Sequence, residues 1–320
     1  MNNPLLFSHP GDLPPFSRIK PEHIEPAIDQ ILAENRSRIS ELLQNTGRYT
    51  WENTFQPLED MDDRLNQTWS PVNHLHSVAD NDGLRAAYNI CLPKLSEYAT
   101  EMGQNEGLYK AYRKIADADE YNQLTIAQQK IIANELRDFM LSGVHLDAGK
   151  KQRFKEIQQE LSRLQTKFEE NLLDSTQAWK KLVTDRDKLA GLPESALALA
   201  EQTAQREGHE GWIFTLEFPS YMPVMQYAEN AELRREMYQA YVTRASDQGP
   251  NAGQWDNSEI METILELRSQ IAQLLDFQSY AHYSLARKMA RTPDEVMEFL
   301  NDLAEKSLPM ARKELEEVSA

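Results

Sequence analysis

The chain has 320 residues, with 34 Lys and Arg against 51 Asp and Glu, which gives a net charge of −17. Such an acidic chain is a poor match for nucleic acids and for anionic membrane surfaces, because both bind proteins through Lys and Arg. A hydrophobic content of 40% is enough for a packed core, and the length suits one large helical domain or two smaller ones.

The single cysteine, Cys91, excludes an intrachain disulfide and fits a reducing compartment. A lone cysteine in an amphipathic stretch is interpreted as a small core residue rather than a nucleophile. The N-terminus has no basic region, and no segment approaches the ~20 apolar residues needed to span a bilayer. We therefore expect a cytoplasmic protein.

The first 20 residues are rich in proline and predict an extended arm. Its apolar anchors are Leu5, Leu6, Phe7 and Phe16. Residues 21–43 then predict an amphipathic helix, and a second helix is expected to open at Asn53 or Thr54. Further helices are predicted over 84–98, with a kink at Pro93, and from about residue 106 to 115.

Two longer helices are predicted over 125–141 and 148–176, joined by a short turn. The second has apolar residues at three- and four-residue spacing: Phe154, Ile157, Leu161, Leu164 and Phe168. This pattern predicts an antiparallel helical hairpin over about 122–176. A coiled-coil dimer is the alternative, although the seam covers barely three heptads before Asn171 interrupts it.

Two short segments, 179–184 and 212–218, are rich in aromatic and β-branched residues, and they predict a small antiparallel β element within 179–218. A helix is expected between them over 193–207. Residues 218–223 predict a rigid aromatic loop. A place beside a peptide channel would explain its aromatic residues, and core packing explains them as well. Asn230 is expected to cap a helix that ends near Arg244, followed by a mobile surface loop over 246–253.

Residues 255–303 predict three amphipathic helices in tandem. Asp256 and Glu259 are spaced as a reciprocal cap for the first. The second is expected to begin near Ser279 and to carry Tyr283 and Met289 inward. Thr292 is placed to cap the third.

This stretch also carries a family resemblance. Its motifs are D-N-S-E-I at 256–260, I-L-E-L-R at 264–268, A-Q-L-L-D-F at 272–277, Y-A-H-Y-S-L at 280–285 and K-M-A at 288–290. They resemble the thimet-oligopeptidase family of zinc metallopeptidases, and in particular its bacterial branch. The chain departs from the family at Asp276, where Gly is usual, and at Gln270, where many members have Glu. Asp276 closes a helix, so we expect a left-handed conformation there.

The resemblance covers nearly the whole chain but only the N-terminal half of the family's proteins. It implies two largely helical halves that flank a channel, in which zinc-activated water cuts short peptides. It also implies a zinc-binding His-Glu-x-x-His on a helix. The seven histidines are His9, His23, His74, His76, His145, His209 and His282. No two are four residues apart, and His209-Glu210 is followed by Ile213 where the second ligand should stand.

We therefore assign no catalytic, substrate-binding or metal-binding residue in this chain and expect no bound zinc. His282 is interpreted as a partly buried, hydrogen-bonded histidine. The helical pattern continues to Ala320 without a glycine stop, so we expect the chain to be truncated before the zinc-binding half.

The predicted fold is mainly α: a multi-helix array with one long antiparallel hairpin and one small antiparallel β element. The arm is assigned to 1–20 and the helical N-terminal half of an oligopeptidase-like fold to 21–320. The predicted function is one wall of the peptide channel in a cytosolic zinc oligopeptidase, inactive alone. Short peptides are the expected partners, with a monomer when complete and self-association of this part. The alternative is a stand-alone helical scaffold or protein-interaction module.

Overall fold

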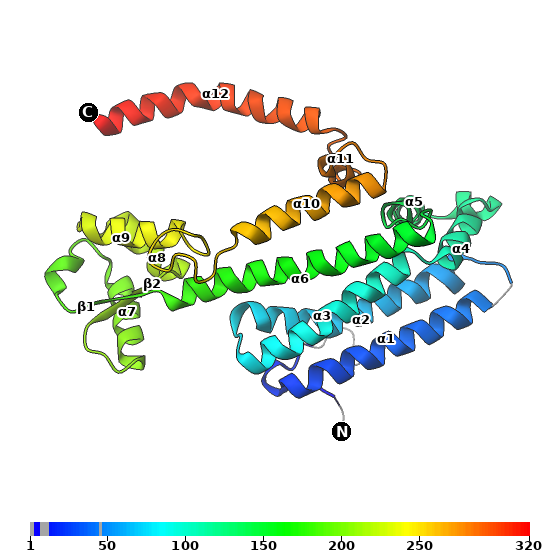
Figure 1. Ribbon diagram of the computed structural model, residues 1–320, viewed down its shortest axis with the longest axis horizontal. Coiled ribbons are helices and arrows are strands. Elements are labelled where there is room, and N and C mark those ends of the chain that lie inside the picture. Colours follow the sequence, from blue (N-terminus) through cyan, green and yellow to red (C-terminus); the bar gives the residue numbers. More distant parts are fainter. Residues whose placement is uncertain (1–2, 7–12, 45–46) are drawn as a thin grey trace. The chain divides into compact units, whose positions relative to one another are not determined.

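The computed structural model describes residues 3–6, 13–44 and 47–320. The chain forms two compact units (Figure 1). Unit 1 comprises Met1–Ser162 and Arg268–Ala320, and unit 2 comprises Arg163–Leu267. Two helices, α6 (Ala148–Ala178) and α10 (Ser258–Leu274), begin in one unit and end in the other.

Unit 1 begins with five helices whose starts follow capping rules. They are α1 (Pro21–Gln44), α2 (Gln56–Val78), α3 (Asp82–Gly103), α4 (Glu106–Ala116) and α5 (Ile126–Leu141). The side chains of Asn81, Asn105 and Thr125 each accept a hydrogen bond from a backbone N–H three residues on. These bonds satisfy N–H groups that the first helical turn leaves unpaired. The predicted helix starts are therefore confirmed to within two or three residues.

Two clusters of buried side chains form the core of unit 1. The first joins α1, α2 and α3, and Leu5 of the N-terminal arm is buried in it. The second gathers around Phe55, whose ring meets the Tyr112 ring edge-on with 4.1 Å between centroids. The predicted anchor Leu5 is confirmed, whereas Phe16 is 41% exposed and Phe7 lies outside the described residues.

Short 3-10 and π-helical turns complete unit 1. The arm ends in a turn at Phe16–Arg18, and a π-helical turn at Trp51–Phe55 leads into α2. A further 3-10 turn, Asp119–Gln123, precedes α5. The predicted helix opening at Asn53 or Thr54 is therefore displaced, because Thr50 caps the π-helical turn instead.

The predicted antiparallel hairpin over 122–176 is not formed. Both helices are present, but α5 packs against α4, and Figure 1 shows α5 end-on while α6 lies in the plane of the picture. The physical reason lies in the connection between them. Gly143 has φ +78, and the backbone N–H of Val144 donates to the Phe139 carbonyl, so the chain turns sharply at the end of α5. Phe139 is buried with Tyr112 of α4, which supplies α5 with its partner.

Unit 2 contains the only β-sheet within the described residues. The strands β1 (Lys180–Val183) and β2 (Trp212–Thr215) pair antiparallel, with Val183 opposite Trp212. A 3-10 turn, Arg186–Leu189, follows β1, and α7 (Glu194–Arg206) lies between the strands in sequence. The predicted β element and intervening helix are confirmed. The core of unit 2 contains Trp179, Val183, Leu189, Leu197, Phe214, Leu216, Tyr221, Val224, Leu233 and Met237.

The predicted aromatic loop at 218–223 is wrong, because these residues begin α8 (Phe218–Tyr227). Pro219 lies in the first turn, where a missing N–H costs nothing. Tyr221 and Val224, three residues apart, are both buried against the unit 2 core. Helix α9 (Ala231–Val242) follows and is capped by Asn230 as predicted.

The predicted reciprocal cap between Asp256 and Glu259 does not form. Asp256 Oδ1 instead accepts from the Ser258 backbone N–H at 2.9 Å. Asp276 has φ +58, so the predicted left-handed conformation at the end of α10 is confirmed. Helix α11 (Tyr280–Leu285) is short, and Met289 beyond it is 98% exposed, so its predicted inward position is wrong.

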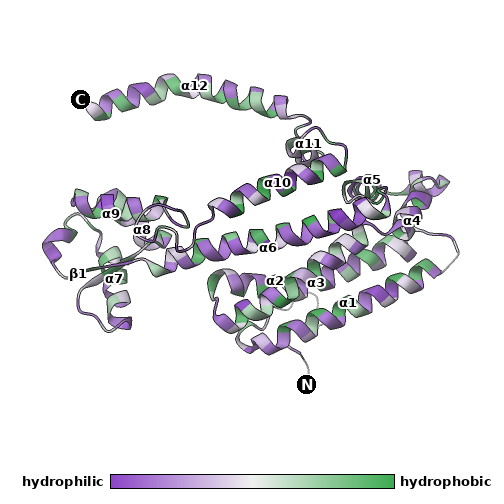
Figure 2. Cartoon of the chain, viewed as in Figure 1, coloured by the Kyte–Doolittle hydropathy of each residue, from purple (hydrophilic) through white to green (hydrophobic). Residues whose placement is uncertain are grey.

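Helix α12 (Pro293–Ser319) is described from end to end and buries none of its side chains. Its cap is the predicted one, since Thr292 Oγ1 accepts from the Glu295 backbone N–H. The colours of Figure 2 alternate along this helix, as expected for an amphipathic sequence. Its apolar side is exposed and includes Met297, Phe299, Leu300, Leu303, Leu308, Met310, Leu315 and Val318.

Candidate functional site

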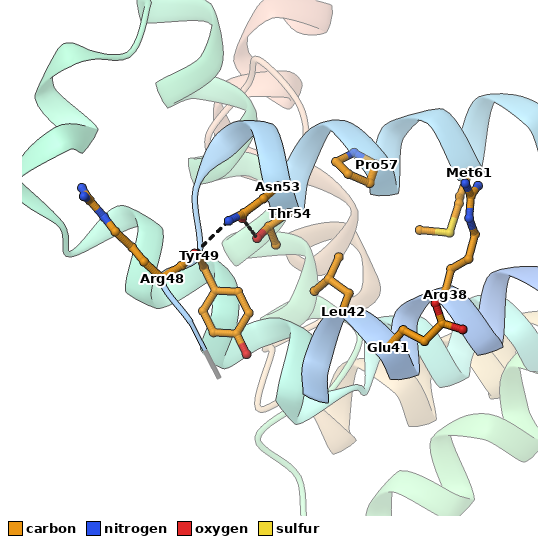
Figure 3. Close-up of a pocket in the computed structure, with 9 residues that line it drawn as sticks. All are labelled: Arg38, Glu41, Leu42, Arg48, Tyr49, Asn53, Thr54, Pro57 and Met61. Atoms are coloured by element: carbon orange, nitrogen blue, oxygen red, sulfur yellow. Dashed lines mark hydrogen bonds between the residues drawn. The ribbon is translucent and has the colours of Figure 1, made fainter. Parts of the chain in front are cut away.

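A hollow of about 250 Å³ lies where α1, the π-helical turn and the start of α2 meet in unit 1 (Figure 3). It is lined by Arg38, Glu41, Leu42, Arg48, Tyr49, Asn53, Thr54, Pro57 and Met61. The hollow is open on one side and smaller than most pockets that bind small molecules. Its position follows from the turn at Thr50, which brings the segment before α2 beside the end of α1.

The polar groups beside the hollow form hydrogen bonds that hold this turn in place. The Thr50 backbone N–H donates to Asn53 Oδ1 at 2.8 Å, and the Asn53 backbone N–H donates to Thr50 Oγ1 at 3.2 Å. Asn53 Nδ2 also donates to the Arg48 carbonyl at 2.8 Å (Figure 3). The Asn53 side chain uses its donors and acceptors in hydrogen bonds to the backbone. It is therefore a structural cap rather than a reactive group.

The charged side chains around the hollow point in different directions. Arg48 extends away from the α1 residues and pairs with Glu120 (Figure 3). Lys114 lies 5.3 Å from the centre of the Tyr49 ring. A second hollow of about 360 Å³ shares Arg48 and Tyr49 with the first, and Trp51, Tyr121 and Leu124 are among its other lining residues. The two hollows offer aromatic and cationic surface, but they contain no nucleophile paired with a base among the described residues.

Two carboxylates with raised pKa values occur on α2 and α5. Burial raises the pKa of Glu135, and the nearby carboxylates of Asp138 and Glu59 raise it further, while Arg287 lowers it. Burial likewise raises the pKa of Glu59, with Asp62 and Asp60 adding to the effect. These groups sit against the second core cluster, where burial also raises the pKa of Tyr112. Carboxylates with shifted pKa values can mark a functional site. These two are not accompanied by a basic group that would serve as their acid–base partner.

Within the described residues, no group of three His, Cys, Asp or Glu side chains could hold a metal ion. His209 lies in the loop before β2, and Ile213 is 3% exposed in the core of unit 2. His282 is partly buried and its Nδ1 lies 2.9 Å from Ser279 Oγ, as the sequence predicted. His76 stacks on Tyr88 with ring centroids 4.1 Å apart, and His9 lies outside the described residues.

Cys91 is fully buried in the first core cluster of unit 1. Burial raises the pKa of its thiol to about 11, so the thiolate is scarce at neutral pH. The prediction of a core cysteine is confirmed. Sequence reasoning missed the hollow near Tyr49, because its lining comes from three separate segments. The spacing of Thr50 and Asn53 was the one local signal for it.

Two family models match this chain. Residues 28–152 match the model described as Neurolysin/Thimet oligopeptidase, N-terminal domain, and residues 224–320 match Peptidase family M3. The chain is 52% identical over 318 residues to oligopeptidase A of Haemophilus influenzae, covering 99% of this chain and 46% of that protein. It is also 52% identical over 320 residues to oligopeptidase A of Escherichia coli, covering 100% of this chain and 47% of that protein.

A more distant plant relative gives the same picture. The probable cytosolic oligopeptidase A of Arabidopsis thaliana is 37% identical over 326 residues, covering 100% of this chain and 45% of that protein. Along its whole length the chain therefore resembles the thimet-oligopeptidase family of M3 peptidases. It spans about half the length of the curated relatives it matches.

Proposed function

We propose that this chain is the N-terminal part of a zinc-dependent oligopeptidase that hydrolyses short peptides. The observation that supports this most directly is the 52% identity, along the whole chain, to proteins named oligopeptidase A. Identity at this level along the whole chain supports a shared fold. The match to Peptidase family M3 over residues 224–320 supports the same reaction class.

The residues of this chain do not fit a catalytic zinc ion. A zinc peptidase needs two histidines on one face of a helix with a glutamate between them, and the printed sequence has no two histidines four apart. The nearest approach to the motif, at His209, has the buried Ile213 in place of the second ligand. We therefore derive no step of hydrolysis from this chain and assign zinc to the part of the longer relatives that has no counterpart here.

The proposed role of the chain is to shape one wall of a peptide channel and to keep folded proteins from the metal. Extended helices serve such a role because they supply a stable surface without contributing ligands. A cytoplasmic location is proposed by analogy with the relative named cytosolic. None of the described helices is long and apolar enough to span a membrane.

Measurements of bound zinc and of peptide cleavage by the chain itself test the proposal that the metal is bound elsewhere. After dialysis against a weak chelator and incubation with zinc, we expect less than a tenth of a zinc ion per chain and no cleavage of an internally quenched peptide. The expected result follows from the missing ligand pair, since tight zinc binding needs several ligands held together in the right geometry. One firmly held zinc per chain, or zinc-dependent cleavage, would overturn the proposal that the metal is bound elsewhere.

A protein-interaction module is the second candidate, and one observation favours it. The apolar side of α12 is exposed along its whole length, with Phe299 62% and Leu315 67% exposed. Apolar surface of this extent marks a contact site or an aggregation hazard. The two candidates differ in what covers α12. Measuring how the chain associates with rising concentration addresses that difference.

A further inference from the structure

The second hollow of unit 1 is large enough to hold a small molecule. Its volume of about 360 Å³ falls within the range of pockets that bind small ligands, whereas the first hollow is smaller. It lies between the π-helical turn Trp51–Phe55, the end of α4 and the 3-10 turn Asp119–Gln123. Every described residue that lines it belongs to unit 1.

The wall of this hollow is aromatic and apolar. Tyr49, Trp51 and Tyr121 supply rings that are each partly buried, and Ile115 and Leu124 supply aliphatic surface. Rings that keep part of their surface accessible hold aromatic ligands by offset stacking and edge-to-face contact. An aromatic group therefore suits the interior of the hollow better than a polar group does.

The wall is held in place by contacts that need no ligand. The Trp51 ring stacks on the fully buried Phe55, with centroids 5.0 Å apart and an angle of 8° between the planes. The Tyr121 hydroxyl donates to the Gln129 carbonyl at 3.2 Å, and Gln129 Nε2 donates to the Leu124 carbonyl at 3.0 Å. Side chains fixed in this way lose little further freedom when a ligand binds, which lowers the entropic cost of binding.

Charges of both signs lie at the same hollow. Arg48, which points away from α1 in Figure 3, pairs with Glu120, and the two side chains are 61% and 51% exposed. An ion pair this exposed is weak, and the planar fork of arginine keeps further donors for a second carboxylate. Glu52 also lines the hollow, is exposed, and pairs with no residue in the described part of the chain. The hollow therefore offers a cation and an unpaired carboxylate beside an aromatic interior.

We propose that this hollow binds a free aromatic amino acid. The ring of the ligand lies among the aromatic side chains, its ammonium group pairs with Glu52, and its carboxylate pairs with Arg48. Only a ligand with both charges beside a ring satisfies all three parts of the site. A peptide bond on either side of the amino acid removes one of these charges, so the site distinguishes a free amino acid from the same residue within a peptide.

The biological source of the ligand rests on the proposed function, whereas its binding does not. In an oligopeptidase, free amino acids are the end products of the peptide degradation in which the enzyme takes part. The site then senses the accumulation of those end products. Binding is measured without any peptide cleavage, so the site and the proposed function can fail separately.

Nuclear magnetic resonance on the isotopically labelled chain tests the site. The reporter is the indole N–H signal of Trp51, assigned from its absence in Trp51→Phe. The probes are L-phenylalanine, its amide, which lacks the carboxylate, N-acetyl-L-phenylalanine, which lacks the ammonium group, and L-alanine, which lacks the ring. L-Phenylalanine should move the signal and bind roughly ten times more tightly than each of the other three. If no probe moves the signal, or any analogue binds as tightly as L-phenylalanine, the proposal is wrong.

Two variants of exposed residues assign the two charges of the ligand. Glu52→Gln should lower the affinity for L-phenylalanine roughly tenfold but leave that for N-acetyl-L-phenylalanine unchanged, because only the first carries an ammonium group. Arg48→Gln should likewise lower the affinity for L-phenylalanine but leave that for its amide unchanged, because the amide has no carboxylate.

Asp119→Asn is the matched control for both variants. Asp119 is an exposed carboxylate of the same unit, beside Glu120 in sequence, and it does not line the hollow. Its replacement changes the net charge as Glu52→Gln does, but every affinity should stay the same. A loss in Asp119→Asn equal to that in Glu52→Gln, or unchanged binding of L-phenylalanine in both site variants, would contradict the proposal.

Discussion

At the scale of single residues, backbone conformation separates two glycines that the sequence alone does not distinguish. Gly191 and Gly208 have φ +86 and +76, a region that other residues adopt at a cost. A side chain at Gly191 would collide with the Tyr227 carbonyl oxygen, whereas the space around Gly208 is open to beyond 4 Å. The two positions therefore share the conformational strain but differ in steric room.

Gly208→Ala should lower the free energy of unfolding by about 1–2 kcal/mol, the cost of the left-handed conformation alone. Gly191→Ala should lower it by at least twice as much, because the backbone of residue 227 must also move. Urea denaturation of both variants measures the difference. Equal losses would mean that the close approach at Gly191 is relieved at no cost.

Glu135 predicts a dependence of stability on pH. Its pKa is raised in the folded protein, first by burial and then by neighbouring carboxylates, so the ionised form is less stable in the folded chain than in the unfolded one. This destabilisation is present above the folded pKa and disappears as pH falls towards the unfolded value. Glu135→Gln should therefore raise the melting temperature at pH 7, and the gain should vanish near pH 4.

Glu97 provides the matched control with the opposite sign. A hydrogen bond from Lys155 Nζ at 2.6 Å lowers the pKa of Glu97, so its stabilisation is present above the unfolded pKa and is lost as pH falls through the folded one. Glu97→Gln should lower the melting temperature slightly at pH 7 and have no effect in acid. Calorimetry across this pH range distinguishes the two, and a stabilising Glu97→Gln would contradict the assignment.

At the scale of secondary structure, α6 tests the apolar pattern of the long helix. Leu161 is 5% exposed, and the sequence had placed it in the buried seam. Leu161→Ala should cost roughly 2–5 kcal/mol, the range for removing a buried leucine side chain. Gln165→Ala, one turn further on at an exposed position, should change stability by at most ~0.5 kcal/mol. Similar losses in urea denaturation would mean that the buried face of α6 lies elsewhere.

Local signals in the sequence were enough for most element boundaries. Asn230 and Thr292 each cap the helix that they were predicted to cap, and Asp276 adopts the predicted left-handed conformation. Gln270, which departs from the family pattern, accepts a hydrogen bond from Arg153 at 2.6 Å, a role that glutamate would fill as well. These features depend on a few neighbouring residues, so spacing alone identifies them.

Features that depend on distant contacts were not predictable. The partner of α5 is α4 rather than α6, because Phe139 packs on Tyr112 and no sequence spacing links the two. Residues 218–223 were expected to form a loop because two prolines stand there, but Pro219 is harmless in a first helical turn.

At the scale of the whole molecule, the exposed side of α12 determines how the chain behaves in solution. Phe299, Leu303 and Leu308 were expected to lack a complete cover, and they are 62%, 47% and 49% exposed. We expect the chain to associate with rising concentration and to bind a hydrophobic dye. Hydrogen exchange in α12 should be faster than in α10, which buries Ile264, Leu267 and Ile271.

Leu303→Glu should reduce both association and dye binding, whereas Glu298→Gln, a conservative change of an exposed residue of the same helix, should leave them unchanged. Analytical ultracentrifugation over a hundredfold range of concentration measures the association. A chain that stays monomeric, ignores the dye and protects α12 fully would show that α12 is already covered. Such a result would remove the observation that favours a protein-interaction module.

The activity of a chimera tests the proposed function most directly. In it, this chain replaces the 320 residues that it matches in Escherichia coli oligopeptidase A, which make up 47% of that protein. We predict that the chimera cleaves an internally quenched short peptide, that a chelator abolishes the cleavage, and that added zinc restores it. A soluble, folded chimera that holds zinc but leaves the peptide intact would contradict a role for this chain in shaping the channel of an oligopeptidase.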